Sequence, residues 1–514
     1  MNTKYIITVF TSLALTACNL DYNPTTAVSD ATLTSSDYEN LLTGVYDGAQ
    51  SIKLNINDIA ADNLTSPGWW PDIDNNGQTA STSSDINSLW NSHYKYVQLA
   101  NNLINLIDNT PNPTIQQIQI SAQAHVIRGW LYSQIAQHWG DAPLLLEVTD
   151  ALAPRDPEAE IWKQVVADFE YGVENAPEFS DRGYVSKVAA KALLARTLLT
   201  GAPEVKDVVR AKQLAEEIIS SNQFTLADNF ADIFHAKSSN EIILQWTNLN
   251  GDSGSDGWFM RSDIVNLYEA ENGHGSAGYG EQGRYENRVD KSAFSIFENS
   301  DKRKDATVRH LKLANGVETW DCVKYPSYNA ADPWPVIRIA ELYLISAETQ
   351  GYPDGVERLN QLRQIRGLNA YVVGTDITVD NFLEKIMHER RLEFFAEGLR
   401  WYDLRRWFNS GEAGKKAVLS LRKYQPGETA GSRPQASETM NIADDGHNLL
   451  WPIPQTAIDH DPNLLPQNPA FWVTRSRVRP IIEFSGIKTR GHRQKNSLFF
   501  TFFNKNGFYP ASTS

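Results

Sequence analysis

Segments with helical spacing follow one another along the first half of the chain. In each segment apolar residues recur every three or four positions, which is the spacing of one face of an α-helix. The segments lie at 37–50, 89–107, 114–139, 156–177, 186–200 and 208–221. Short turns separate most of them, so neighbouring helices should pack as antiparallel hairpins. The pattern predicts a mostly α-helical scaffold that resembles stacked tetratricopeptide-type hairpins, although no clean repeat of about 34 residues is present.

The middle of the chain has a different composition. Residues 242–246 are an apolar run typical of a short strand. Residues 251–335 interleave aromatic and polar side chains, and eight glycines lie between positions 251 and 283. This composition predicts an irregular, loop-rich segment that carries short strands. Helical spacing then returns, and helices are expected at 336–350, 355–367, 380–397 and 400–408.

The N-terminus has the pattern of an export signal. Lys4 precedes an apolar run that ends at Leu15, and this run is shorter than the roughly 20 residues that a membrane-spanning helix needs. Small residues directly precede Cys18, which resembles a bacterial lipobox. We therefore expect residues 1–17 to be a signal peptide and Cys18 to carry the acyl chains that anchor the protein. The alternative is an ordinary signal peptide with a chance cysteine near its end.

Charge and cysteine content exclude several classes of protein. Asp and Glu outnumber Lys and Arg by 62 to 47, for a net charge of −15, so the chain is not expected to bind nucleic acid. Cys322 is the second of two cysteines, and with Cys18 assigned to lipidation no disulfide framework is available. We expect Cys322 to be a small buried apolar residue.

Short motifs for cofactors and metals lack the context that they need. Residues 278–283 match G-x-G-x-x-G, but no strand precedes them and no helix follows, so they indicate a loop. His388 and Glu389 begin an H-E-x-x-H motif that fails because position 392 is leucine. Residues 72–77 resemble the first half of a calcium loop, but Ser83 stands where the bidentate glutamate is required. This leaves two alternatives for the loop, a calcium site and an Asx-rich turn, and no other cofactor is predicted.

Three glutamates invite comparison with a glycosidase. Glu389, Glu393 and Glu397 are spaced by four residues, as on one face of a helix, and several arginines lie nearby. A general acid needs a raised pKa, whereas pairing with a guanidinium lowers the pKa of a carboxyl group. We therefore interpret these residues as structural ion pairs and predict that the protein is not an enzyme.

Aromatic residues in polar loops are the best candidates for a binding site. A sugar ring has an apolar face and a hydroxyl rim, so its binding site needs an exposed aromatic ring flanked by polar groups. The candidates are Trp69, Trp70, Trp258, Tyr279 and Trp320. For each of them the alternative is that the ring packs beneath its own loop. Tryptophans on the predicted helices should instead belong to the core, namely Trp90, Trp130, Trp139, Trp162, Trp401 and Trp407.

Five blocks occur in the order typical of one known family. The longest runs from His388 to Trp407, and the others are residues 128–143, 336–348, 359–367 and 451–469. With the lipobox they cover residues 18–471, and the chain resembles the SusD/RagB family of outer-membrane nutrient-binding lipoproteins. The resemblance implies a helical scaffold whose loops bind a glycan at the cell surface. It also implies a partner, a SusC-like TonB-dependent transporter in the outer membrane. Family members that serve peptide uptake make a peptide-binding lid the alternative, and a surface glycan hydrolase is less favoured.

The C-terminal segment departs from this family pattern. Residues 472–514 contain eight Lys or Arg and one Glu, although the rest of the chain is strongly acidic. Their aromatic run at 499–503 has no periodic context. We expect a poorly ordered extension, or an out-of-frame or read-through tail, and no functional domain.

Overall fold

Helices account for most of the described part of the chain, as the sequence predicts. A computed structural model describes residues 34–52, 54–66, 70–81, 83–235, 239–247, 288–290, 293, 296–312, 318–325, 332–423 and 440–469. The contacts within the chain divide it into residues 1–472 and residues 473–514, and all described residues belong to the first unit. The signal peptide, Cys18, the 278–283 motif and the C-terminal extension therefore lie outside the described residues.

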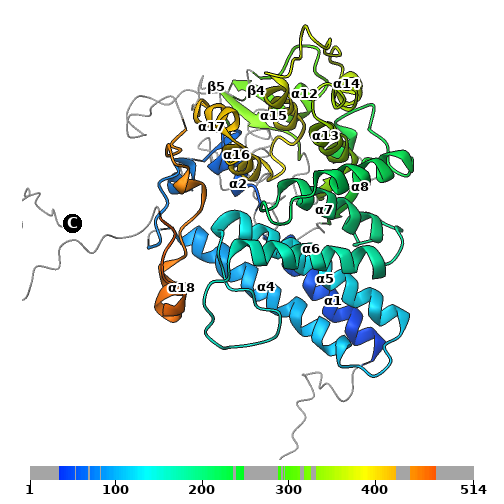
Figure 1. Ribbon diagram of the computed structural model, residues 1–514, viewed down its shortest axis with the longest axis vertical. Helices are drawn as coiled ribbons and strands as arrows, with labels where there is room; N and C mark the ends of the chain where they lie inside the picture. Colours follow the sequence, from blue (N-terminus) through cyan, green and yellow to red (C-terminus); the bar gives the residue numbers. More distant parts are fainter. Residues whose placement is uncertain are drawn as a thin grey trace, which may run out of the picture. The chain divides into compact units, whose positions relative to one another are not determined.

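The first half of the unit is a succession of packed helical pairs. Each helix contacts the next along the chain, and α8 packs against α13 (Figure 1). These helices are α1 (Ser35–Gln50), α4 (Ser84–Asp108), α5 (Ile115–Trp139), α6 (Glu158–Asn175), α7 (Lys187–Thr200), α8 (Val208–Ser220) and α13 (Ile339–Gln350). The arrangement confirms the predicted fold class of helical pairs.

Local sequence signals fix the ends of α5. The hydroxyl of Thr114 accepts a hydrogen bond from the backbone N–H of Gln117 at 3.2 Å, and the Gln117 side chain returns to the backbone of Thr114. This reciprocal cap satisfies backbone groups that the first turn would otherwise leave unpaired. At the other end Gly140 adopts φ +69°, a left-handed conformation that stops the helix where the sequence predicts its end.

Small residues allow three helices to approach closely. The alanines of α7 at positions 189, 190 and 192 are completely buried. A Cβ atom added to Gly172 in α6 would lie 2.2 Å from Val126 in α5 and 2.9 Å from Ala190 in α7. The glycine is therefore required by the packing of α6 between its two neighbours, as the alanine-rich composition of α7 suggests.

The second half of the unit adds shorter helices around the scaffold. They are α14 (Val356–Ile365), α15 (Phe382–Glu393), α16 (Arg400–Phe408), α17 (Glu412–Leu419) and α18 (Gln455–His460). Single-turn elements are α2 (Ile56–Ala60), α3 (Pro71–Asp74), α9 (Asp232–His235), α12 (Lys304–Thr307), η2 (His447–Leu449) and η3 (Pro462–Leu464). The tryptophans expected in the core are all buried, at 5% exposure or less, and Cys322 is also buried.

One predicted helix begins later than expected. Residues 334–338 form strand β6 (Trp334–Arg338), and helix α13 starts only at Ile339. β6 pairs antiparallel with β2 (Ile242–Trp246), and every residue of both strands is buried. A strand buried on both faces has a continuous apolar sequence, which periodicity cannot distinguish from the start of a buried helix. The predicted helix at 336–350 is therefore wrong for its first three residues.

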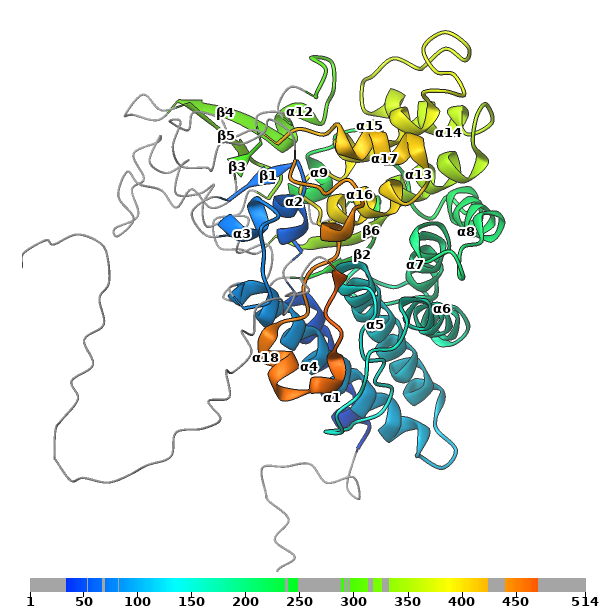
Figure 2. The ribbon, with the colours of Figure 1, turned by 60° about the vertical axis from the view of Figure 1, so that its left-hand side comes forward.

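A second, four-stranded antiparallel sheet lies among the irregular segments. Its order is β1-β3-β5-β4, with β1 (Leu64–Thr65), β3 (Arg288–Val289), β4 (Val308–Lys312) and β5 (Glu318–Cys322). Figure 2 shows these strands side by side. The short strands that the sequence predicts within 251–335 are therefore present, and β1 is an additional partner from the first part of the chain.

Candidate binding site

The four-stranded sheet brings together segments that are far apart in the sequence. Thr65 in β1 is in register with Arg288 in β3, and Arg288 is in register with Asp321 in β5. The segment after β1 contains two of the predicted binding tryptophans, the glycine-rich segment before β3 contains two further aromatic residues, and β5 contains the fifth. The points at which the predicted binding segments join the scaffold are thus adjacent strands of one sheet.

The five candidate aromatic residues differ in what the structure describes. Trp69, Trp258 and Tyr279 lie outside the described residues. Trp320 lies within β5, where its backbone is paired opposite His310, and its side chain lies outside the described part. Their contact with a ligand stays a prediction.

Trp70 is buried in the structure. Only 5% of the residue is exposed, and its side chain belongs to the main hydrophobic core. It is the N-cap residue of α3, and Pro71 occupies the first helical position, where a proline lacks no needed hydrogen bond. The expectation of an exposed platform is therefore corrected at this position, and the alternative that the ring packs beneath its own loop is supported.

Protein groups occupy the resemblance to a calcium loop. The ammonium of Lys423 lies 2.7 Å from Asp74 Oδ1, and the hydroxyl of Thr65 donates to Asp74 Oδ2 at 2.9 Å. Lys423 also donates to the backbone carbonyl of Asp74 at 2.9 Å. Since a lysine already neutralises this buried carboxylate, the structure favours the turn over a calcium site. Within the described residues no three His, Cys, Asp or Glu side chains are grouped to hold a metal ion.

The three glutamates of the signature segment belong to a buried ion-pair network. Arg303 contacts Glu389 at 2.7 Å and Glu393 at 3.0 Å. Arg338 contacts Glu393 at 2.6 Å and Glu397 at 2.8 Å. All five side chains are nearly or fully excluded from solvent. Further members are Glu241, Asp301, Lys324, Arg363 and Arg366.

The nearby arginines pair with other carboxylates. Those of the signature segment contact Asp62, Glu158, Glu348 and Asp403. The expected single helical face is also corrected, because α15 ends at Glu393 and Glu397 lies beyond it. Two left-handed residues, Ala396 and Gly398, turn the chain between α15 and α16.

Electrostatics in this network oppose acid catalysis. Burial acts to raise the pKa of Glu393, but the charges of Arg366 and Arg338 outweigh it and hold that pKa well below its usual range. Burial likewise opposes ionisation of Glu397, and Arg338 with Lys324 still lowers its pKa. A general acid must hold a proton near neutral pH, which these carboxyl groups do not. The network therefore stabilises the fold and offers no glycosidase pair.

Comparison with known proteins follows the same division of the chain. Residues 321–472 match the model of the SusD family, and residues 20–199 match a family described as "Starch-binding associating with outer membrane". A SusD-like protein of Bacteroides ovatus is 23% identical over 466 residues, which is 79% of this chain and 83% of the relative. None of the described helices is long and apolar enough to cross a bilayer.

Solved structures share the fold. A SusD superfamily protein of Bacteroides thetaiotaomicron superposes with a TM-score of 0.67 at 20% identity, covering 85% of this chain and 100% of the other. Surface glycan-binding protein A of Bacteroides uniformis gives 0.67 at 21% identity, covering 85% and 99%. At these identities the likeness concerns the fold.

Proposed function

Because this chain belongs to the SusD/RagB family, whose members are non-catalytic binding proteins, we propose that it binds an oligo- or polysaccharide at the cell surface. The matching family model is named for starch binding and for association with the outer membrane. One structural neighbour is named as a surface glycan-binding protein and another as a carbohydrate-binding protein. The buried, paired glutamates are consistent with binding that leaves the glycan intact.

The adjacency of β1, β3 and β5 is the observation that carries this proposal. Loops that start from neighbouring strands can present several aromatic rings to one extended ligand. Two or more rings that engage successive sugars raise the overall affinity without any single strong contact. In this proposal Trp69, Trp258, Tyr279 and Trp320 are the platforms, and Trp70 supports them from below.

The bound glycan would then be delivered to a transporter. We propose a SusC-like TonB-dependent protein of the outer membrane as the partner, and acyl chains on Cys18 as the link to that membrane. More than one acyl chain is needed for stable anchoring, which a lipoprotein cysteine would supply. Co-purification of a TonB-dependent transporter with the anchored protein tests this step, and recovery of the protein without any transporter would count against it.

Binding assays separate the proposed function from its alternatives. The mature protein is titrated with neutral and acidic polysaccharides and with a peptide mixture, and the glycans are then analysed for new reducing ends. Saturable glycan binding without new ends is the expected result. Binding to peptides with no glycan binding would favour the peptide lid, and release of new ends would show a hydrolase.

A further inference from the structure

A cleft within the helical scaffold is separate from the loops. It has a volume of about 580 Å³ and lies where the C-terminal ends of α5 and α7 meet the N-terminal end of α6 and helix α16. A deeper recess of about 30 Å³, large enough for one or two water molecules, shares five lining residues with it. These are Gln137, Trp162, Thr200, Tyr402 and Arg406. The volume falls in the range of small-molecule sites.

The charged groups on the inner walls neutralise one another. Arg405 contacts Glu158 at 2.6 Å. Arg406 makes two hydrogen bonds to Glu348, at 2.5 and 2.9 Å, and a third to Asp403 at 2.8 Å. A charged ligand would therefore have to compete with an existing ion pair, whereas a neutral ligand would leave each pair intact.

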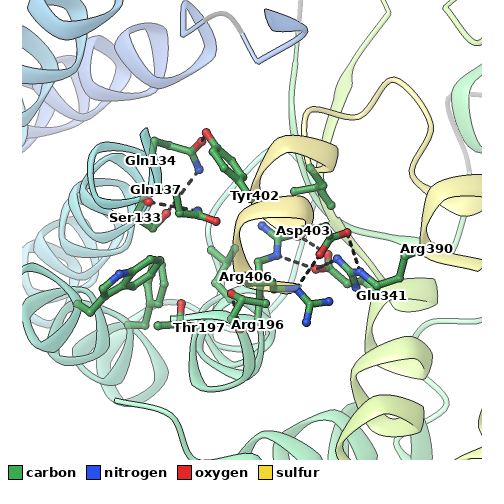
Figure 3. A pocket seen from close by; sticks show the side chains of 15 residues that line it. Ser133, Gln134, Gln137, Arg196, Thr197, Glu341, Arg390, Tyr402, Asp403 and Arg406 are labelled. Carbon is green, nitrogen blue, oxygen red and sulfur yellow. Dashed lines mark hydrogen bonds and ion pairs between the residues drawn. The ribbon is translucent and has the colours of Figure 1, made fainter. Parts of the chain in front are cut away.

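Neutral hydrogen-bonding groups line the same space. Ser133, Gln134 and Gln137 lie along α5 facing Tyr402, and the Tyr402 hydroxyl donates to Gln134 Oε1 (Figure 3). Gln137 Nε2 donates at 3.1 Å to the carbonyl of Ser133, a contact within its own helix. The nitrogen of Gln134 makes a long contact of 3.4 Å to the Ser133 hydroxyl. Thr197 adds a hydroxyl group from α7. Amides held so weakly keep hydrogen-bonding capacity for a ligand.

An apolar wall completes the cleft. The Trp162 indole is oriented by its N–H, which donates to Glu158 at 2.9 Å, and Leu199, Ala202 and Pro203 continue the wall. Apolar carbon next to neutral amides and hydroxyls matches the two faces of a sugar ring. We propose that this cleft is a second binding site, for a neutral mono- or disaccharide, which does not depend on the loop aromatics.

Small neutral sugars test this proposal directly. The mature protein is titrated by calorimetry with a panel of glucose, galactose, mannose, maltose, cellobiose and lactose, and with glucuronate and glucosamine as charged probes. Gln137→Ala removes an amide whose hydrogen bond stays within α5, so folding should persist, and Thr197→Val replaces one hydroxyl at constant shape. We expect at least one neutral sugar to saturate the protein, and each substitution to weaken that binding about tenfold, which is the loss of one hydrogen bond of about 1.4 kcal/mol.

Two controls keep the cleft and the loops distinguishable. Gln223→Ala, at an exposed position after α8, and Trp258→Ala, in the glycine-rich segment, should leave the affinity for the small sugar unchanged. The proposal is overturned if no neutral sugar of the panel binds, if the charged probes bind more tightly, or if the cleft variants bind like the wild type. Binding lost in Trp258→Ala alone would also overturn it, while supporting the loops as the only site.

Discussion

The guanidinium of Arg338 lies 2.6 Å from the carboxylate of Glu393, and both side chains are almost completely buried. Arg338 is the last residue of β6 and Glu393 is the last residue of α15. Their contact therefore ties the two-stranded sheet to the helix of the signature segment. The same guanidinium also reaches Glu241 on the segment that leads into β2, so one residue joins three parts of the fold.

Removal of this arginine should destabilise the protein strongly. Arg338→Met leaves buried carboxylates without their main partner, and breaking a buried pair from one side typically costs about 3–5 kcal/mol. The exposed pair of Lys187 and Glu178 supplies the control, because Glu178 is 82% exposed and such pairs contribute little. Urea unfolding of Arg338→Met and Lys187→Met measures both. Similar losses in the two variants would contradict a structural role of the network.

The network should also make stability depend on pH in a defined direction. The pKa of Glu393 is lower in the folded protein than its ordinary value of 4.5, so its contribution is complete above about pH 5. It is lost as the pH falls below 4.5, because the unfolded state then binds the proton more readily. The difference in unfolding free energy between wild type and Glu393→Gln should therefore shrink between pH 5 and pH 3. A difference that stays constant over this range would contradict the prediction.

Two glycines in helices should respond to alanine in opposite ways. Gly172→Ala places a methyl group against Val126 and Ala190, and such overpacking costs about 1–3 kcal/mol. Gly44 in α1 has no atom within 4 Å of the corresponding position, so Gly44→Ala should stabilise the helix by about 0.5–1 kcal/mol. Thermal unfolding of both variants checks the signs, and a gain in stability for Gly172→Ala would refute the packing argument.

Lipidation predicts a simple change of fraction. Cys18→Ala removes the only side chain that the lipobox offers for acylation, so the variant should leave the membrane fraction and remain soluble. Fractionation followed by mass measurement of the mature N-terminus tests this. An unchanged share in the membrane, with normal removal of residues 1–17, would show that another contact holds the protein there.

Local patterns predicted the helical scaffold well. Helix α5 begins at a capping threonine and ends at a left-handed glycine, and both signals are visible in the residues themselves. The expectation failed where pairing is non-local. β1 has two residues and pairs with β3 across more than half of the scaffold sequence, and so short a strand leaves no periodic signal.

The partners of the buried glutamates were also hidden for a physical reason. Arginines close to Glu393 in sequence pair elsewhere, whereas Arg303, Arg338 and Arg366 arrive from three other segments. Charge types in a sequence indicate that pairs will form, but tertiary packing decides which residues meet. The same limit applies to Trp69 and Trp70, which share a loop sequence although the second packs in the core.

Calorimetry of the loop tryptophans tests the central claim, that exposed aromatic rings on the sheet bind a glycan. The cognate oligosaccharide is titrated into wild type and into Trp69→Ala, Trp258→Ala and Trp320→Ala, with Asp72→Asn as the control for a nearby carboxylate. Loss of a central aromatic anchor costs about 2 kcal/mol, so at least one tryptophan variant should bind roughly 30-fold more weakly. The Asp72 variant should change the affinity much less. If all three tryptophan variants fold and bind like the wild type, the binding site lies elsewhere and the account is wrong.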